Sequence, residues 1–247
     1  MIELQKNSID KRNNMLGNKQ VWEKEYHKKN LMRGDKPQRF FLNFLKFLKK
    51  EYKKSEKNID FSDLKALDLG SGEGKNSLYL AERGLEVHGI EFASNAICVA
   101  REHSRKKGLH INFIEKSFGS HFDLEDDFFN IIIDINSSNS LNEEERNIYL
   151  EESFRVLKSG GYFFVRIPAK DGDPNAKKLL KQFPAKEKDT YIIPEFGLKE
   201  RVFSREDLID CYGKLFEIVK LEKETRYTTY GSKKYKRNFW ILVLRKK

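Results

Sequence analysis

Residues 66–74 read Ala66-Leu67-Asp68-Leu69-Gly70-Ser71-Gly72-Glu73-Gly74, and this stretch decides the fold. A short apolar strand runs directly into three glycines at alternate positions. Glycine allows the tight turn, and it lets a ligand approach backbone that a side chain would cover. A dinucleotide-binding loop would need its third glycine at position 75, where Lys75 stands. The G-x-G-x-G pattern therefore predicts a ligand site but weakens the case for a pyrophosphate ligand.

Strands and helices alternate on both sides of this loop. Apolar runs indicate further strands at residues 86–91, 111–115, 128–135 and 162–167. Helical spacing predicts helices at residues 18–30, 38–52, 77–83, 94–107 and 143–157, and residues 158–161 are expected to form a turn. Strands separated by helices imply a parallel sheet that is covered on both faces. The predicted fold class is therefore α/β, with a doubly wound sheet.

The last third of the chain has a looser pattern. Asp171-Gly172-Asp173-Pro174 and two later prolines predict a long irregular segment, and such segments are often lids or binding loops. Ser204 is expected to cap a helix whose inner face carries Leu208, Ile209, Tyr212 and Leu215. Residues 216–220 and 238–244 are expected to pair as a terminal hairpin.

Two carboxylates narrow the range of ligands that the glycine loop could bind. Glu91 closes the second strand 19 residues after Gly72, where a carboxylate can accept hydrogen bonds from both hydroxyls of a ribose. Asp68 puts a second carboxylate beside the loop, which repels a pyrophosphate but suits an ammonium or sulfonium group. A nucleoside with a cationic end fits both residues, and S-adenosylmethionine has both features.

From Trp22 onward the sequence resembles the Rossmann-like, class I S-adenosylmethionine-dependent methyltransferases. The resemblance rests on residues 68–74, Gly89-Ile90-Glu91, Phe129-Asn130-Ile131-Ile132-Ile133-Asp134 and Leu157-Lys158-Ser159-Gly160-Gly161. Within that superfamily, residues 74–81 followed by Gly84-Leu85-Glu86-Val87 resemble the branch of tellurite-resistance and thiopurine-type methyltransferases. The resemblance implies a seven-stranded sheet whose last strand, residues 238–244, is antiparallel to the rest.

The sequence departs from this family at two places. Many relatives carry an acid after the third strand that binds the adenine amino group, whereas Ser117 stands here. The fourth-strand motif usually begins with Asp and is often followed by a histidine; Asn130 begins it here, and residues 136–140 contain no histidine. A dedicated histidine base is therefore not expected.

These arguments give a set of candidate site residues. We expect the cofactor to be bound by Trp22, Tyr26, Arg33, Asp68, Gly70, Ser71, Gly72, Gly74, Asn76, Glu91, Phe92, Ser117, Phe118 and Asp134. We expect Asp134, Asn136 and Arg166 to act at the reacting centre, because ligands of open α/β sheets gather at the carboxyl ends of central strands.

Three of these predictions have a competing structural explanation. Trp22 and Tyr26 lie one helical turn apart and either cover the cofactor or pack in the core. Arg33 either holds the methionine carboxylate or is a solvated arginine. Arg166 lies within an apolar strand, so it either pairs with a buried acid such as Asp134 or faces an anionic substrate.

Composition bounds the remaining possibilities. The 247 residues carry 48 basic and 38 acidic side chains, a formal charge of +10 that favours anionic partners without identifying one. No apolar stretch is long enough to span a bilayer and the first residues lack the pattern of a secretory signal, so we expect a cytoplasmic protein, monomeric or homodimeric, with no membrane partner. Cys98 and Cys211 are expected to be buried spectator thiols, and the histidines have no metal-ligand spacing.

The expected organisation is a helical lid at residues 1–37 and a methyltransferase domain at residues 38–247, in which residues 168–203 form a substrate-side insertion. Within that insertion Phe183, Tyr191, Ile192, Ile193 and Phe196 are expected to form apolar walls, and Arg201 and Arg205 join Arg166 in supplying positive charge. Three functions remain open: a small-molecule methyltransferase, which is favoured, an RNA methyltransferase, and a nucleoside-binding module without turnover. Tyr191, Glu195 or Tyr227 could assist a hydroxyl acceptor, whereas thiolates and metalloid oxyanions need no base.

Overall fold

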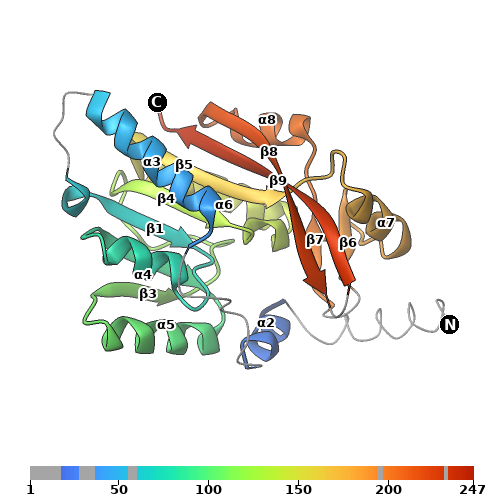
Figure 1. Cartoon of the computed structure of the whole chain (residues 1–247), viewed down its shortest axis with the longest axis horizontal. Helices are drawn as coiled ribbons and strands as arrows, with labels where there is room; N and C mark the ends of the chain where they lie inside the picture. The colour runs from blue at the N-terminus through green and yellow to red at the C-terminus, as the bar shows by residue number, and fades with distance from the viewer. Residues whose placement is uncertain (1–17, 28–36, 55–59, 194–196, 231–232) are drawn as a thin grey trace.

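The computed structural model describes residues 18–27, 37–54, 60–193, 197–230 and 233–247 (Figure 1). A seven-stranded sheet with the order β3-β2-β1-β4-β5-β9-β8 forms its centre. The strands are β1 (Lys65–Leu69), β2 (Glu86–Glu91), β3 (Ile111–Glu115), β4 (Phe129–Ile135), β5 (Leu157–Pro168), β8 (Glu217–Tyr230) and β9 (Lys233–Arg245). β1 to β5 pair in parallel, and β9 is antiparallel to both β5 and β8. The α/β fold with an antiparallel last strand is confirmed.

Two layers of helices cover the sheet because successive strand residues point to opposite faces. In β4, Ile131 and Ile133 face one hydrophobic cluster, and Ile132 faces the other. The first face is covered by α3 (Arg39–Lys54), α4 (Lys75–Ala81) and α5 (Ser94–Lys106). The second face is covered by α6 (Glu143–Val156) and α8 (Arg205–Tyr212). The predicted helices match these within a few residues at each end.

The expected turn at residues 158–161 lies inside β5 instead. Leu157 already pairs with Phe129 of β4, and the ladder resumes at Tyr162 opposite Ile131 after a register shift. Gly160 has a φ of 76° and its N–H donates to the Lys246 carbonyl, so the glycines shape a bulge within the strand rather than a connection before it.

The segment after β5 is more ordered than its prolines suggested. It contains α7 (Pro174–Gln182) and a two-stranded sheet of β6 (Thr190–Ile192) and β7 (Lys199–Arg201). Asp173 starts the helix, because its carboxylate accepts from the N–H groups of Asn175 and Ala176 and Pro174 occupies the first turn. The prediction of an irregular segment was therefore wrong: the same Asp-Pro pair that suggested a turn is a helix start.

A buried ionic junction ties this insertion to the terminal hairpin. Arg237 of β9 is 6% exposed, and its guanidinium pairs with Asp173 at 3.3 Å and with Glu200 at 2.6 Å. The same group donates to the Tyr191 hydroxyl at 3.0 Å, and Asp173 also accepts from the Asn238 N–H at 2.8 Å. Arg237 is thus an interior residue.

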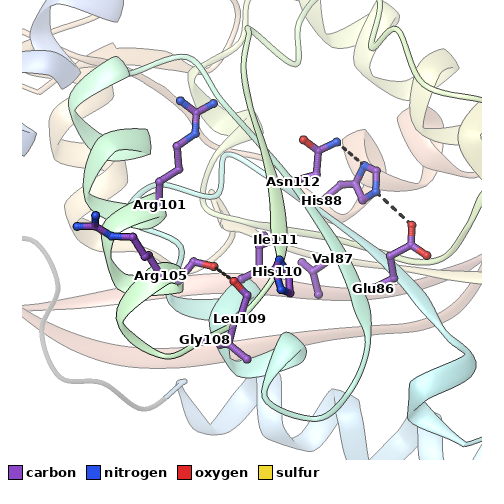
Figure 2. A pocket seen from close by; sticks show the side chains of 11 residues that line it. Glu86, Val87, His88, Arg101, Arg105, Gly108, Leu109, His110, Ile111 and Asn112 are labelled. Atoms are coloured by element: carbon purple, nitrogen blue, oxygen red, sulfur yellow. Dashed lines mark hydrogen bonds and ion pairs between the residues drawn. The ribbon is translucent and has the colours of Figure 1, made fainter.

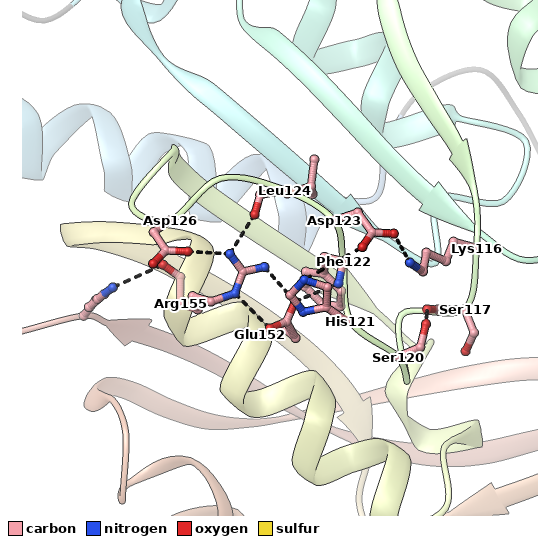
Figure 3. Close-up of polar contacts among 11 residues, drawn as sticks. Lys116, Ser117, Ser120, His121, Phe122, Asp123, Leu124, Asp126, Glu152 and Arg155 are labelled. Carbon is pink, nitrogen blue, oxygen red and sulfur yellow. Dashed lines mark hydrogen bonds and ion pairs between the residues drawn. The ribbon is translucent and has the colours of Figure 1, made fainter.

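A second polar network fixes the loop between β3 and β4 (Figure 3). Glu152 of α6 accepts from the Phe122 N–H at 2.7 Å, and Arg155 donates to Glu152 and to the Leu124 carbonyl at 2.7 Å. Burial disfavours the Glu152 carboxylate, but the hydrogen bonds from Arg155 and the Phe122 N–H outweigh it and lower the pKa of Glu152 to about 2. This network holds the loop between β3 and β4. The same loop carries Ser117 at the carboxyl edge of the sheet.

Two smaller expectations are also corrected. Cys98 is exposed and Cys211 is half-buried, so neither is the buried thiol expected. Ile209 is 38% exposed although the capped helix α8 forms as predicted, with Leu208 and Tyr212 buried. Across the described ranges, no helix is both long and apolar enough to pass through a bilayer.

Candidate functional site

A cavity of about 710 Å³ opens at the carboxyl edge of the parallel strands, where β1, β2, β3 and β4 end. In Figure 1, β1 points toward the side of the molecule on which α2 (Asn18–His27), β6 and β7 lie. The lining residues are Lys19, Trp22, Tyr26, Gly70, Glu91, Phe92, Glu115, Lys116, Ser117, Phe118, Ile135, Asn136, Ser137, Asn139, Ser140, Leu141, Asn142, Glu145, Glu187, Thr190 and Lys199. The glycine loop and the insertion therefore face one cavity.

The glycine loop forms one wall. Gly70 has a φ of 69° and its N–H donates to the Ile90 carbonyl at 2.8 Å, which folds the loop back over β2. Gly74 has a φ of 82° and precedes α4. The Ser71 hydroxyl is buried without a hydrogen-bond partner. Gly74 and Ser71, like Asp68 and Asn76, support or flank this wall but do not line the cavity.

Glu91 sits where the loop, β2 and α5 meet. One carboxylate oxygen accepts from the Gly72 N–H at 3.0 Å, and the other accepts from the N–H groups of Phe92 and Ala93 at 2.9 Å. Burial raises the pKa of Glu91, and these three N–H groups oppose that rise. The carboxylate is thereby held at the cavity edge in a fixed orientation.

Asp68 lies under the glycine loop. It is 2% exposed and accepts from the Ser77 hydroxyl at 2.6 Å, which ties β1 to α4. Burial raises its pKa to about 7. The predicted contact of Asp68 with a cationic ligand end stays a prediction, and its observed contact supports the loop.

The short helix α2 covers the cavity from the side of β3. Glu23 accepts from the N–H groups of Ser94 and Asn95 at 2.7 and 3.1 Å, so a residue of α2 caps the start of α5. Tyr26 and Trp22 are in tilted ring contact with centroids 5.7 Å apart, and a Cβ added to Gly72 would lie 2.8 Å from the Tyr26 hydroxyl. Nothing in the spacing of the sequence pointed to Glu23. The predicted Arg33 lies outside the described residues.

We expect Glu23→Ala to weaken binding of S-adenosylmethionine by about 2- to 30-fold, because a lost helix cap is worth about 0.5–2 kcal/mol and releases α2 from the cavity. Calorimetric titration of the cofactor measures the effect. Lys24→Ala changes an exposed residue of the same helix and should bind normally. Equal affinity in both variants would make α2 a packing element rather than a cover.

The segment after β4 builds another part of the cavity wall. Asn136 has a φ of 60° and lines the cavity, and its side-chain oxygen accepts from Arg166 at 2.8 Å. Asp134 is fully buried, accepts from the Tyr149 hydroxyl at 2.8 Å and does not line the cavity. Of the three residues expected at the reacting centre, Asn136 alone borders the cavity in the described structure.

Arg166 pairs with a partly buried acid, Glu224, and not with the expected Asp134. It is 3% exposed and pairs with Glu224 of β8 at 3.2 Å, between the rings of Phe40 and Phe239. Burial lowers its pKa to about 10. Through its hydrogen bond to Asn136, Arg166 is placed to orient that side chain rather than to meet a substrate.

The insertion contributes different residues from those expected. Tyr191 and Ile193 pack in the insertion's own small core with Ala176 and Val202, and neither they nor Phe183 and Ile192 line the cavity. Arg201 and the exposed Arg205 are also absent from the lining, and Phe196 lies outside the described residues. The cavity instead receives Glu187, Thr190 and Lys199, which no periodic pattern marked.

Of the residues expected to assist a hydroxyl acceptor, Tyr191 and Tyr227 do not line the cavity. Tyr191 is fully buried and its hydroxyl bonds Glu200 and Arg237, while burial raises its pKa. Tyr227 is 71% exposed on β8. Glu195 lies outside the described residues.

A second cavity, of about 610 Å³, lies at the opposite edge, where β2 and β3 begin (Figure 2). His88 there contacts Glu86 at 3.4 Å and Asn112 at 3.3 Å, and Arg101 donates to the Phe113 carbonyl at 2.7 Å. These side chains already have protein partners. The glycine loop and Glu91 make the first cavity the candidate functional site.

Comparison with known proteins agrees with this geometry. A model of the methyltransferase domain family matches residues 60–216. A SAM-dependent methyltransferase structure from Methanosarcina mazei is 27% identical with a TM-score of 0.66 and covers 74% of this chain and 92% of that one. TehB from Haemophilus influenzae is 22% identical with a TM-score of 0.58, covering 74% of this chain and 58% of that one, which is a likeness of fold. The narrower tellurite-resistance or thiopurine branch stays a prediction.

Curated relatives match over shorter stretches. The 2-heptyl-1-hydroxyquinolin-4(1H)-one methyltransferase of Mycobacteroides abscessus is 33% identical over 101 residues, 41% of this chain and 44% of the relative. A ubiquinone biosynthesis O-methyltransferase of Shewanella sp. is 25% identical over 100 residues, 40% of this chain and 42% of the relative. A 23S rRNA (uracil(747)-C(5))-methyltransferase of Pyrococcus abyssi is 44% identical over 50 residues, 20% of this chain and 12% of the relative. The chain thus spans less than half the length of these relatives.

Proposed function

Because this chain belongs to the methyltransferase domain family, whose class I fold and S-adenosylmethionine cofactor the sequence predicted, we propose that it methylates a small-molecule acceptor. One observation carries the proposal: the cofactor-side loop and the insertion line a single cavity, so an acceptor seated against the insertion reaches the cofactor side directly. The cavity of about 710 Å³ has the size of a small-molecule site.

The residues of the glycine-loop wall fit the expected cofactor. Gly70 and the Glu91 carboxylate border the cavity, and glycine at position 72 lets the Tyr26 hydroxyl lie against the loop, since an added Cβ would be 2.8 Å from it. Glu91 would hold the ribose, and Ser117 and Phe118 would adjoin the base, as the resemblance implies. The bound cofactor supplies a methyl group on a sulfonium.

The chain's own contribution to the reaction is orientation and exclusion of water. Methyl transfer is an in-line displacement, and alignment of the two reactants can be worth about 7–11 kcal/mol. Trp22 and Tyr26 would cover the cavity from α2, and Asn136, held by Arg166, would orient the acceptor. An acceptor that still holds its proton needs a base, and Glu187 is a carboxylate of the insertion that borders the cavity.

The charge pattern of the cavity favours a small acceptor over RNA. Four acids, Glu91, Glu115, Glu145 and Glu187, stand among three lysines, whereas an RNA site needs a basic track for phosphates. The quinolone and ubiquinone-biosynthesis relatives support the same substrate class by their names. The match to the rRNA enzyme covers 12% of that protein and gives weaker support to the alternative.

Turnover of labelled S-adenosylmethionine against pooled thiols, phenols, sugars, metalloid oxyanions and RNA tests the proposal, at low and moderate salt. We expect methylation in a small-molecule pool that persists in salt. Lys199→Ala should raise the acceptor KM, and Lys186→Ala, an exposed lysine of the same insertion, should not. Methylation of RNA alone, lost as salt rises, would overturn the substrate class. Cofactor binding without turnover in any pool would favour a nucleoside-binding module.

A further inference from the structure

Arg146 of α6 is a buried cation with open hydrogen-bond donors. It is 3% exposed, and Nη2 donates to the Leu141 carbonyl at 2.5 Å. Its Nε and Nη1 atoms are buried and have no hydrogen-bond partner. Because burial of a charge with open N–H groups is unfavourable, Nε and Nη1 are positions at which an acceptor from outside the described chain would be stabilising.

A second arginine shares the same environment. Arg201 of β7 also has a buried Nε without a partner, and both guanidinium groups lie over the Phe203 ring, at 5.3 Å for Arg146 and 4.9 Å for Arg201. In the described ranges neither arginine forms an ion pair within 4.0 Å. Burial, followed by repulsion from Arg201, lowers the pKa of Arg146. The two arginines beside Phe203 therefore have three buried nitrogen atoms without a hydrogen-bond partner: Nε and Nη1 of Arg146 and Nε of Arg201.

Neither arginine is among the residues that line the cavity, but both adjoin residues that do. Leu141, whose carbonyl Arg146 holds, lines the cavity, as do Asn142 and Glu145 of the adjoining turn. Thr190, the ladder partner of Arg201, lines it from the insertion. Asn139 also borders the cavity, and its buried Oδ1 atom has no partner either. Unpartnered polar atoms therefore cluster at this end.

We propose that Arg146, together with Arg201, binds an anionic oxygen group of the methyl acceptor. The inference rests on the proposed function and names a feature of its substrate: an acceptor that carries a carboxylate or phosphate group, whose oxygens accept from the open N–H groups of the two arginines. The same chemistry is present in the methionine carboxylate of the cofactor, and the test separates these sources.

The first test uses protein saturated with S-adenosylhomocysteine. Calorimetry then measures how tightly benzoate, phenyl phosphate and neutral benzamide bind to it. We expect at least tenfold tighter binding of one of the anions than of benzamide, and loss of that preference in Arg146→Met and Arg201→Gln. Arg205→Gln, which removes an exposed arginine at the start of α8, should keep it. No anion preference in the parent, or an unchanged preference in Arg146→Met, overturns the proposal.

Two further readouts separate the alternatives. The affinity of S-adenosylhomocysteine should be the same in Arg146→Met and the parent; a tenfold loss would assign the arginine to the cofactor carboxylate instead and overturn the proposal. Arg146→Met should also leave the Tm of the ligand-free protein unchanged or higher, since methionine removes an unpaired buried charge and keeps the packing on Phe203. A lower Tm together with unchanged anion binding would mark Arg146 as a structural support of the Leu141 carbonyl.

If benzoate binding depends on Arg146 but no acceptor pool is methylated, the anion site stands and the proposed function fails.

Discussion

Replacing Glu91 with glutamine is expected to weaken binding of S-adenosylmethionine and S-adenosylhomocysteine by about 10- to 150-fold. The charged hydrogen bonds that a ribose would make to this carboxylate are worth about 1.5–3 kcal/mol. Glutamine has nearly the same shape, so the packing around β2 persists while one oxygen becomes an amide donor. In Glu91 both carboxylate oxygens accept from backbone N–H groups, one from Gly72 and the other from Phe92 and Ala93. The amide NH₂ of glutamine would place a donor against one of these N–H donors.

Glu86→Gln is the matched control for this measurement. Glu86 begins the strand that Glu91 ends and is exposed. Its ion pair with Lys65 at 3.2 Å and its contact with His88 at 3.4 Å lie at the opposite edge of the sheet. Exposed pairs of this kind contribute about 0–1 kcal/mol, so cofactor affinity should be normal. Glu91 would be removed from the cofactor site by either of two calorimetric results. One is normal cofactor affinity in Glu91→Gln as well, and the other is a preference of the parent protein for a nicotinamide dinucleotide.

Replacing Gly70 with alanine should have the largest effect on both stability and cofactor binding. The residue has a φ of 69°, and an added Cβ would overlap the Cβ and Oγ atoms of Ser137. The unfavourable backbone region costs about 1–3 kcal/mol, and overpacking costs about 1–3 kcal/mol more. Relief of the overlap must move the loop after β1 or the loop after β4, and both line the cavity. We expect cofactor binding to fall below detection.

Gly160→Ala separates strain from overlap. Gly160 has a φ of 76°, and nothing lies within 4 Å of the position that its Cβ would take. It should lose stability through the backbone alone, by about 1–3 kcal/mol, with cofactor affinity unchanged. Chemical unfolding and calorimetry of both variants measure the two effects. Similar losses in the two proteins would show that the contact with Ser137 is unimportant.

The cofactor half of the fold could be predicted because its determinants are local. The strands at residues 86–91 and 111–115 have the predicted ends, since each apolar run is bounded by turn residues within the same stretch of chain. The positive φ angles of Gly70, Gly72 and Gly74 follow from the spacing of the glycines. Glu91 lies at the cavity edge because the parallel strands end together there.

The part of the cavity formed after β4 and by the insertion could not be predicted because its determinants are contacts between distant residues. Arg166 pairs with Glu224, 58 positions later, although Asp134 is nearer in the sheet. No sequence feature marked Arg146 as interior; its burial and its packing over Phe203 show it. Glu23 caps a helix that begins 71 residues later in the chain. No periodic pattern encodes such pairs.

The ionic junction around Arg237 has a consequence for the order in which the protein acquires its parts. A ribosome releases residues 60–135, with the glycine loop and Glu91, well before residue 237 is made. Until then Asp173 and Glu200 lack the cation that pairs with them in the finished molecule, and the strand that carries it is the last to join the sheet. We therefore expect the nascent chain to complete the region of the glycine loop first, and the insertion to become fixed only when the final hairpin pairs with the sheet.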